Sequence, residues 1–439
     1  MTGLLTTGGQ EFFDWSAPYR LFSQQRLPMP HIFSVIRRHV LTLLPADAPL
    51  RVAIDDSLLR KTGIRIPGVA WRRDPLGPRF QTNFVLAQRV LQFSADVPIA
   101  GGHHRMIPIS FTHAPTPTKP GPKASSQQRS AYNKASRQLC LSAIAAQQIT
   151  ALRQALDAEP GGAARPLHLF VDNGYTNANV LKKLPCHTVL VGRLRKDAKL
   201  YFLPANSSSQ PKRGRPLRYG DIAPTPEQLR VDDTVPWQTV SISLSGVTHS
   251  IRVKVLHHLL WRTAGLQHRL QLVVLAPVGY RLRKGSKLLY RKPGFLICTD
   301  DQMDLTELIQ GYVQRWDIEV NFREEKTLLG VGQAQVRHPE SVQSAPALQV
   351  ASYAMLLLAT TPATLQTPTD SLPLPKWSPA PKTAPRTSTQ RAINQLRAEV
   401  WSRALGLRDF SDFVASTPPT SKPENFAPHL PSALFYASN

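Results

Sequence analysis

Cysteine is scarce in this sequence of 439 residues. Its three cysteines, Cys140, Cys186 and Cys298, lie far apart, and no two have Cys-x-x-Cys spacing. This pattern argues against a disulfide framework and a thiolate zinc site, and it fits a reducing compartment. The first residues also lack a basic segment followed by an apolar one, so we expect no secretory signal peptide.

Long hydrophobic runs are lacking as well. The best candidate for a membrane span is the uncharged stretch 345–361, which Pro346, Gln349 and Ser352 interrupt. Its apolar part is well short of the ~20 residues that a membrane-spanning helix needs. We therefore interpret this stretch as a buried helix and expect no association with a membrane.

Acidic residues are few relative to basic ones. The chain has 53 Lys and Arg against 29 Asp and Glu, for a formal net charge of +24, and 42% of its residues are hydrophobic. That hydrophobic content is enough to build a core, so the positive charge belongs to a folded protein. Solubility alone needs a net charge of only about 2–8 in a small domain. A folded protein this basic indicates a polyanionic partner, and we expect nucleic acid.

Short apolar strands and amphipathic helices alternate in the first half of the chain. Residues 50–54 form an apolar strand that ends on Asp55, and residues 167–171 form another that ends on Asp172. This mixture predicts an α/β fold. Further strands are expected over 84–93, 106–111 and 188–191, with a long helix over 131–156 and a short one over 177–183.

The pattern changes after residue 192. Alternating β-branched segments predict mostly strands up to residue 299, and a helix then starts near Asp304 and runs to about Gly330. These changes divide the chain into six parts. They are a helical accessory or DNA-binding region (1–47), the first part of the α/β core (48–192), a β-rich insertion (193–300), the second part of the core (301–361), a proline-rich linker (362–389), and a C-terminal helix and tail (390–439).

Three acidic residues stand at positions that core packing does not explain. Asp55 and Asp172 end strands, and Glu319 lies in the helix that follows the β-rich insertion. In open α/β sheets, ligands bind beyond the carboxyl ends of the strands. Carboxylate oxygens are the ligands that Mg²⁺ prefers, and two such ions about 4 Å apart can stabilise both the attacking and the leaving oxygen in phosphodiester chemistry.

The helix around Glu319 has a distinctive polar face. With Tyr312 at zero and about 100° per residue, Arg315, Glu319, Arg323 and Lys326 fall within an arc of about 80°. A solvated face with ordinary ion pairs is the alternative interpretation, but it predicts scattered angles. The neighbouring apolar stripe consists of Ile309, Val313, Trp316 and Val320, and the acids expected on the surface are Asp317, Glu324 and Glu325.

The same residues carry a resemblance to a known family. Tyr312, Arg315, Glu319 and Lys326 match the Y-x2-R-x3-E-x6-K signature of bacterial insertion-sequence DDE transposases at all four positions. The segments VAIDDS and LFVDNGYTN resemble the strands that carry this family's first and second aspartates, and the pieces occur in family order. The resemblance implies an RNase H-like catalytic core interrupted by a β-rich insertion, with helical N-terminal and C-terminal parts.

The resemblance also implies roles for these residues. Asp55, Asp172 and Glu319 would hold a pair of Mg²⁺ ions, for which Mn²⁺ can substitute. Family members commonly show Asp-x-Thr at the first aspartate, which favours Asp55 with Ser57 in the hydroxyl position, and Asp56 remains an alternative. The residues that would bind DNA phosphates are Tyr312, Arg315 and Lys326, to which the common arc adds Arg323.

Two further features are weaker. The segment Lys212-Arg213-Gly214-Arg215-Pro216 resembles a minor-groove hook, so Arg213 and Arg215 are either DNA contacts or part of an ordinary basic loop. Trp261 in the β-rich insertion is either a core side chain, which we favour, or a platform on which a displaced base stacks.

These observations predict a DNA transposase that cuts transposon ends and joins the freed 3′-hydroxyl to target DNA, with no covalent enzyme intermediate. The expected partners are double-stranded DNA, at the inverted-repeat ends and at the target, and a second copy of the chain that holds the other end. The expected location is the bacterial cytoplasm, at the nucleoid. The rival functions are another RNase H-like nuclease, which would cut without joining, and a catalytically inactive domesticated DNA-binding protein.

Overall fold

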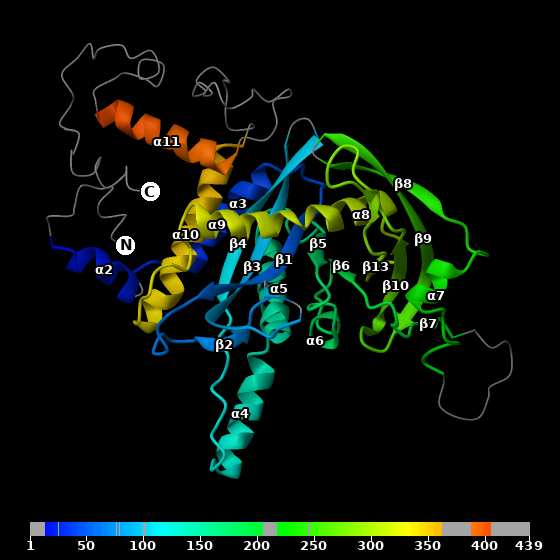
Figure 1. The fold of residues 1–439 in the computed structure, drawn as a ribbon, viewed down its shortest axis with the longest axis horizontal. Helices are drawn as coiled ribbons and strands as arrows, with labels where there is room; N and C mark the ends of the chain where they lie inside the picture. The colour runs from blue at the N-terminus through cyan, green and yellow to red at the C-terminus, as the bar shows by residue number, and fades with distance from the viewer. Residues whose placement is uncertain are drawn as a thin grey trace.

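A sheet of eleven strands forms the centre of the molecule, and helices cover its faces (Figure 1). The computed structural model describes residues 14–24, 26–75, 77–78, 80–99, 102–204, 217–244, 246–361 and 388–404. The strands of this sheet are β1 (Leu50–Arg60), β2 (Ala70–Arg73), β3 (Phe84–Ile99), β4 (His103–His113), β5 (Leu167–Val171), β6 (Thr188–Arg193), β7 (Tyr201–Phe202), β8 (Gln238–Leu244), β9 (Val247–Trp261), β10 (Gly265–Leu275) and β13 (Gly294–Cys298). A separate small hairpin consists of β11 (Gly279–Tyr280) and β12 (Leu289–Tyr290).

Five strands form the core of the sheet in the order β4-β3-β1-β5-β6. Strand β3 pairs antiparallel with both β1 and β4, whereas β1, β5 and β6 are mutually parallel. Parallel neighbours need a crossover connection, which α5 (Leu141–Asp157) and the short α6 (Ala178–Leu181) supply. This order and these directions are those of an RNase H-like core, so the predicted α/β fold class is confirmed.

The two faces of this core carry different side chains, because residues alternate along a strand. Ile54 and Val171 lie in the same hydrophobic cluster as Ile149 of α5. Ala53 and Phe170 face the other way, toward α8 (Leu305–Gln314) and α9 (Asp317–Thr327). The face covered by α8 and α9 is the one on which the candidate site lies.

The strands of the predicted β-rich insertion continue the core sheet. Strand β13 pairs with β6 on one side and with β10 on the other, and β10 pairs with β9. Leu190 of β6, Leu272 of β10 and Ile297 of β13 belong to the same hydrophobic cluster as the core strands. The residues of the insertion thus build one sheet together with the core, and the boundaries 193–300 stay a prediction.

Two helices that the sequence predicted as continuous are each divided. The helix over 131–156 is α4 (Ser126–Gln138) followed by α5, because Cys140 between them has extended backbone angles. The helix over 304–330 is α8 followed by α9, with Arg315 and Trp316 between them. There the amides of Ile318 and Glu319 donate to carbonyls three residues earlier, which is tighter than α-helical pairing. The short elements α7 (Pro226–Val231), β2, β7, β11 and β12 were not predicted.

The remaining helices lie at the two ends of the chain. α2 (Ser16–Ser23) and α3 (Met29–Thr42) precede the sheet, and α3 buries Phe33, Ile36 and Val40. α10 (Pro339–Ala359) is long and apolar enough to cross a membrane by length and composition, but half of its most apolar window is buried in the protein. The predicted helix is therefore confirmed, and it is buried on one side, by residues that include Val350, Tyr353 and Leu357. α11 (Thr389–Ala404) matches the predicted last helix, while 362–387 of the linker and the tail from 405 lie outside the described residues.

Candidate active site

Asp55 and Asp172 lie where the parallel pairing of β1 with β5 ends. Asp172 follows the last residue of β5, as predicted, but the predicted strand end at Asp55 is wrong, because β1 continues to Arg60 in its antiparallel pairing with β3. In the register of β1 with β5, Ile54 is opposite Val171, so the next residue along each segment is an aspartate. Alternation along the strands points both residues to the face that Ala53 and Phe170 share, which α8 and α9 cover. Residues far apart in the sequence are thereby brought together at one edge of the core.

Helix α9 brings Glu319 to the same face. Glu319 lies in the first turn of α9, and the preceding Ile318 packs against Ala53 of β1. Burial raises the pKa of Glu319, Arg315 opposes this, and the negative charge of Asp172 raises the pKa further. Burial also raises the pKa of Asp55 to about 7, against the pull of Arg315, and the charge of Glu319 contributes. The three predicted acids therefore share one electrostatic environment.

Arg315 is the cation embedded in this group. Its side chain is buried at the junction of α8 and α9, with Nη1 3.5 Å from Oδ2 of Asp55. Its Cζ lies 5.5 Å from the centroid of the Tyr312 ring, and burial raises the pKa of that phenol. A guanidinium carries five N–H donors, and the buried Nε of Arg315 has no acceptor among the described residues. Asp55 thus pairs with only part of the Arg315 guanidinium, and other N–H groups of this side chain are left to bind a further acceptor.

Lys326 reaches β1 from the last turn of α9. Its Nζ donates to Oγ of Ser57 at 2.6 Å and lies 6.0 Å from the ring centroid of Phe322. Burial lowers the pKa of Lys326, and the charge of Glu325 opposes that effect. The four signature residues therefore lie along β1 and the end of β5, and Lys326 binds the hydroxyl two residues after Asp55.

The alternative first acid, Asp56, points to the opposite face of the sheet. Its Oδ1 accepts a hydrogen bond from the Tyr175 hydroxyl at 2.9 Å, and its Oδ2 lies 3.2 Å from Nε of Arg89. Because neighbouring strand residues face opposite ways, only one of the two aspartates can join Asp172 and Glu319. The structure places Asp55 in that position.

Several other sequence expectations for this helix are wrong. Trp316, expected in the apolar stripe, is 59% exposed, and Glu325, expected on the surface, is 1% exposed. The angular count assumed one regular helix, and the tight turn at Arg315 and Trp316 interrupts it. The pattern also assigned to solvent a side of α9 that helix α10 covers. The contact is seen in the hydrogen bond that the Tyr353 hydroxyl of α10 donates to Oε2 of Glu324.

The other residues predicted to contact DNA are Arg323, Arg213 and Arg215. Arg323 is exposed on α9, four residues after Glu319, and its DNA contact stays a prediction. Arg213 and Arg215 lie outside the described residues.

Sequence reasoning missed two features beside Asp172. Arg193 ends β6, the next parallel strand, and its charge lowers the pKa of Tyr312. Its position at a strand end is the same signal that singled out the two aspartates. A hollow of about 300 Å³ also borders the loop after Asp172, between Asn173 and Trp261. Trp261 is partly buried and packs against the main hydrophobic cluster, as the favoured core interpretation expects.

The chemistry of the three acids suits a hard divalent cation. Carboxylates supply only oxygen donors, and three of them in a partly buried site repel one another unless a cation joins them. Among the described residues, no three Asp, Glu, His or Cys side chains are spaced as ligands of a single metal ion. Only the chemistry of the donors, three carboxylates, suits Mg²⁺ or Mn²⁺. In this structure Arg315 supplies the positive charge next to Asp55.

Comparison with known proteins supports this assignment for part of the chain. The sequence profile described as DDE superfamily endonuclease matches residues 13–265, more than half of the chain. No curated protein matches this chain. The matched stretch includes Asp55 and Asp172 and ends before Glu319, whose place in the site rests on the geometry above. From the match and the RNase H-like core together, the chain belongs to the DDE superfamily of endonucleases.

Proposed function

We propose that this protein is a DNA transposase, which cuts DNA at the ends of an insertion element and joins the freed 3′-hydroxyl to target DNA. The observation that carries the proposal is the gathering of Asp55, Asp172 and Glu319 on one face of the sheet, beside Arg315. Membership of an endonuclease superfamily implies DNA as the substrate. Cations interleaved with these acids favour a phosphodiester substrate over a neutral one.

Asp55, Asp172 and Glu319 are the residues that would hold divalent metal, Mg²⁺ or Mn²⁺. When bound, the metal supplies Lewis-acid activation of the scissile phosphodiester and stabilises the charge that develops on its oxygens. Burial of Asp55 and Glu319 lowers the local dielectric, which strengthens these interactions.

The cations have a positioning role in this proposal. Arg315 and Lys326 would bind nonbridging phosphate oxygens on either side of the cleaved bond, and the Tyr312 ring orients the guanidinium of Arg315. Holding the DNA backbone at fixed points reduces the entropy cost of aligning the attacking oxygen with phosphorus. Because transposition joins two ends, we propose that a second copy of the chain binds the other end, at the nucleoid in the bacterial cytoplasm.

The proposal is tested with the variants Asp172→Asn and Glu319→Gln. Each removes one carboxylate charge with little change in shape, so we expect cleavage of end-containing DNA to fall by at least about 10³-fold while DNA binding survives. The assay follows cutting and joining of duplex DNA that carries the inverted repeats flanking the coding region, with Mg²⁺ present. Asp56→Asn is the matched control, because Asp56 faces Tyr175 and Arg89 on the other side of the sheet.

Three results would contradict this assignment. If Asp172→Asn or Glu319→Gln still cleaves, the three acids are not the metal ligands. If Asp56→Asn abolishes cleavage while Asp55→Asn does not, the first acid is Asp56. Cutting without joining by the wild-type protein would favour a structure-specific nuclease.

A further inference from the structure

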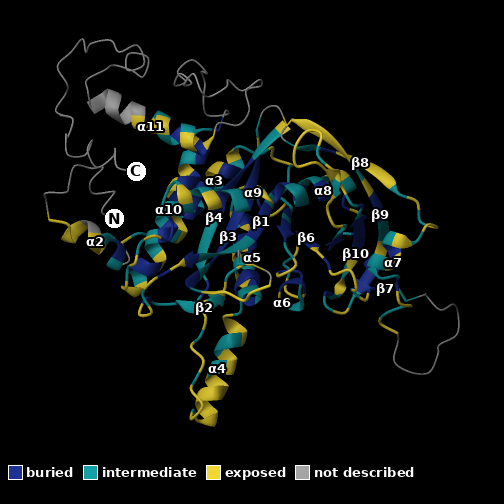
Figure 2. Ribbon diagram, in the orientation of Figure 1, coloured by how far each residue is buried: buried dark blue, intermediate teal, exposed yellow. Residues whose placement is uncertain are grey.

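Residues 114–140 leave the body of the molecule as an arm, made of a proline-rich loop and helix α4 (Figures 1 and 2). The 13 residues of α4 span about 20 Å at 1.5 Å per residue, and none of them is buried. A capping box fixes the start of the helix: Gln128 N–H donates to Ser125 Oγ, and Ser125 N–H donates to the Gln128 side chain. The arm is therefore ordered locally, without packing against the core.

The arm carries positive charge without any acidic residue. No Asp or Glu occurs between Asp96 and Asp157, a stretch that includes the whole arm. None of the arm's cations forms an ion pair with a carboxylate of the described residues. Arg129 is held by one hydrogen bond to the carbonyl of Pro122, at 2.7 Å. The five cations are Lys119, Lys123, Arg129, Lys134 and Arg137.

The three cations of α4 lie on one side of the helix. At about 100° per residue, Arg137 falls near 80° and Lys134 near 140° from Arg129, and the residues between them in angle are polar. These polar residues are Ser126, Ser130 and Asn133. The other side carries Gln128, Ala131 and Ala135. Hydroxyl, amide and cationic groups on one face are the side chains that bind DNA phosphates.

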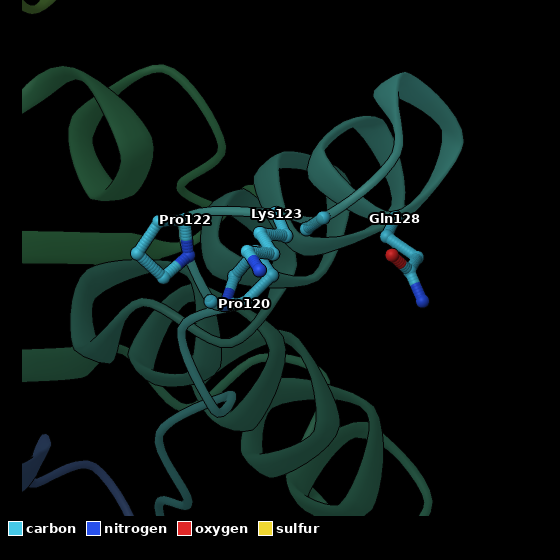
Figure 3. Close-up of a pocket in the computed structure, with 6 residues that line it drawn as sticks. Pro120, Pro122, Lys123 and Gln128 are labelled. Carbon is cyan, nitrogen blue, oxygen red and sulfur yellow. The ribbon is translucent and has the colours of Figure 1, made fainter.

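The loop that leads into α4 adds two cations to the arm and lies beside the side of the helix that carries Gln128. Figure 3 shows Pro120, Pro122 and Lys123 of the loop close to Gln128 in the first turn of the helix, around a shallow open hollow. The prolines restrict the backbone of this segment, so Lys119 and Lys123 are presented with little loss of chain entropy on binding.

Both ends of the arm are attached at the edge of the sheet that carries the candidate active site. The amide of Ala114 donates to the carbonyl of Arg89, and through β3 the neighbouring His113 is level with Ser57 of β1. At the other end, Nδ2 of Asn179, in the segment after Asp172, donates to Oγ of Ser142 at 2.9 Å. DNA whose cleaved bond lies at Asp55 and Asp172 thus has backbone within reach of the arm.

We infer that the arm is a DNA-backbone contact: its cationic face binds phosphates of the duplex whose scissile bond lies in the active site. This inference rests on the proposed function for the identity of the duplex. Phosphate contacts of this kind add affinity and position the DNA without reading its sequence. The arm would therefore hold DNA on one side of the cleavage point.

The test compares the full-length protein with the variant Arg129→Ala/Lys134→Ala/Arg137→Ala. Binding to a labelled random-sequence duplex is measured over a range of salt concentrations. The slope of log Kobs against log[salt] is negative, and each lost phosphate contact makes it less steep by about 0.9. The slope of the triple variant is therefore expected to be less steep than that of the wild type by about 2–3. Because α4 has no buried residue, circular dichroism and the melting temperature should match those of the wild type.

A matched control is Gln128→Glu/Ala131→Glu/Ala135→Glu, which lowers the net charge by the same amount on the opposite side of α4. It should keep a slope close to that of the wild type if the cationic face makes direct contacts. The inference would be overturned if the slope became less steep by the same amount in both variants, or in neither. It would also be overturned if the triple variant changed its oligomeric state and kept the wild-type slope. Failure of the proposed function would appear separately, in the cleavage assay.

Discussion

At the scale of single residues, Glu325 shows how burial changes an acid beside the site. Its side chain is 1% exposed and accepts a hydrogen bond from Nε2 of Gln92 at 2.9 Å. Burial raises the pKa of Glu325 from 4.5 to about 8, opposed by the Gln92 hydrogen bond and by Lys326. The carboxyl is thus protonated in the folded protein at pH values where the unfolded chain has released the proton.

We therefore expect Glu325→Gln to remove a pH-dependent loss of stability. As the pH rises from about 4.5 to 8, the contribution of Glu325 to the free energy of unfolding should fall by about 1.4 kcal/mol per pH unit. It falls because only the unfolded state releases the proton in this range. The variant keeps an uncharged side chain at all these pH values, so its free energy of unfolding relative to the wild type should rise over the same range. Urea unfolding at several pH values measures this.

Glu324→Gln is the control for this experiment. It removes the neighbouring acid of α9, which accepts hydrogen bonds from Tyr353 and Thr389. Equal pH profiles for the wild type and Glu325→Gln would show that Glu325 is ionised in the folded protein.

At the scale of secondary-structure elements, the contact of α8 with β5 sets the position of Arg315. Gly311 lies over the Phe170 ring so closely that a Cβ atom added there would be 2.1 Å from Cζ of Phe170, whose side chain is buried. The missing side chain lets the helix approach the sheet. Arg315 follows one turn later, and its amide donates to the carbonyl of Gly311 at 3.0 Å.

Gly311→Ala should accordingly destabilise the protein, although alanine is normally the better helix former by about 1 kcal/mol. Overpacking of a filled core costs about 1–3 kcal/mol, and here it pushes α8 from the sheet and moves Arg315 away from Asp55. We expect a lower melting temperature together with weaker DNA cleavage. Phe170→Leu added to Gly311→Ala should restore part of the stability, and strictly additive effects of the two changes would contradict the clash.

At the scale of the whole molecule, one sheet joins the core to the β-rich insertion. Hydrogen bonds run without interruption from β1 through β5, β6 and β13 to β10 and β9. The main hydrophobic cluster contains residues of both parts, including Ile54 and Leu272. Loosening one part removes packing from the other, so the two should unfold together.

Leu272→Ala tests this coupling. The side chain is fully buried, so its truncation should cost about 2–5 kcal/mol and lower the protection of β1 amides against hydrogen exchange as much as that of β10 amides. Leu266→Ala, on the same strand but 44% exposed, should change stability by no more than about 0.5 kcal/mol. Unchanged protection in β1 of Leu272→Ala would show that the insertion unfolds separately.

Much of the fold could be predicted from short-range patterns. The apolar strand that carries Asp55, the apolar strand that precedes Asp172, and the helical segments that carry Tyr312, Glu319 and Lys326 depend on spacing within a few residues. Element boundaries were less predictable, because an apolar periodicity continued through the breaks at Cys140 and Arg315. The helix pattern over 131–156 contained no sign that its first part projects from the body as an arm.

The sequence by itself determined the α/β class, the apolar strands beside Asp55 and Asp172, the net charge of +24 and therefore the kind of partner. Only the tertiary structure decided that Asp55 rather than Asp56 faces Glu319, that Glu325 is buried, and that α4 stands in solvent with no buried residue. The physical reason is that periodicity specifies which side of an element is apolar. What covers that side depends on strand register and on helices distant in the chain, such as α10 over α9.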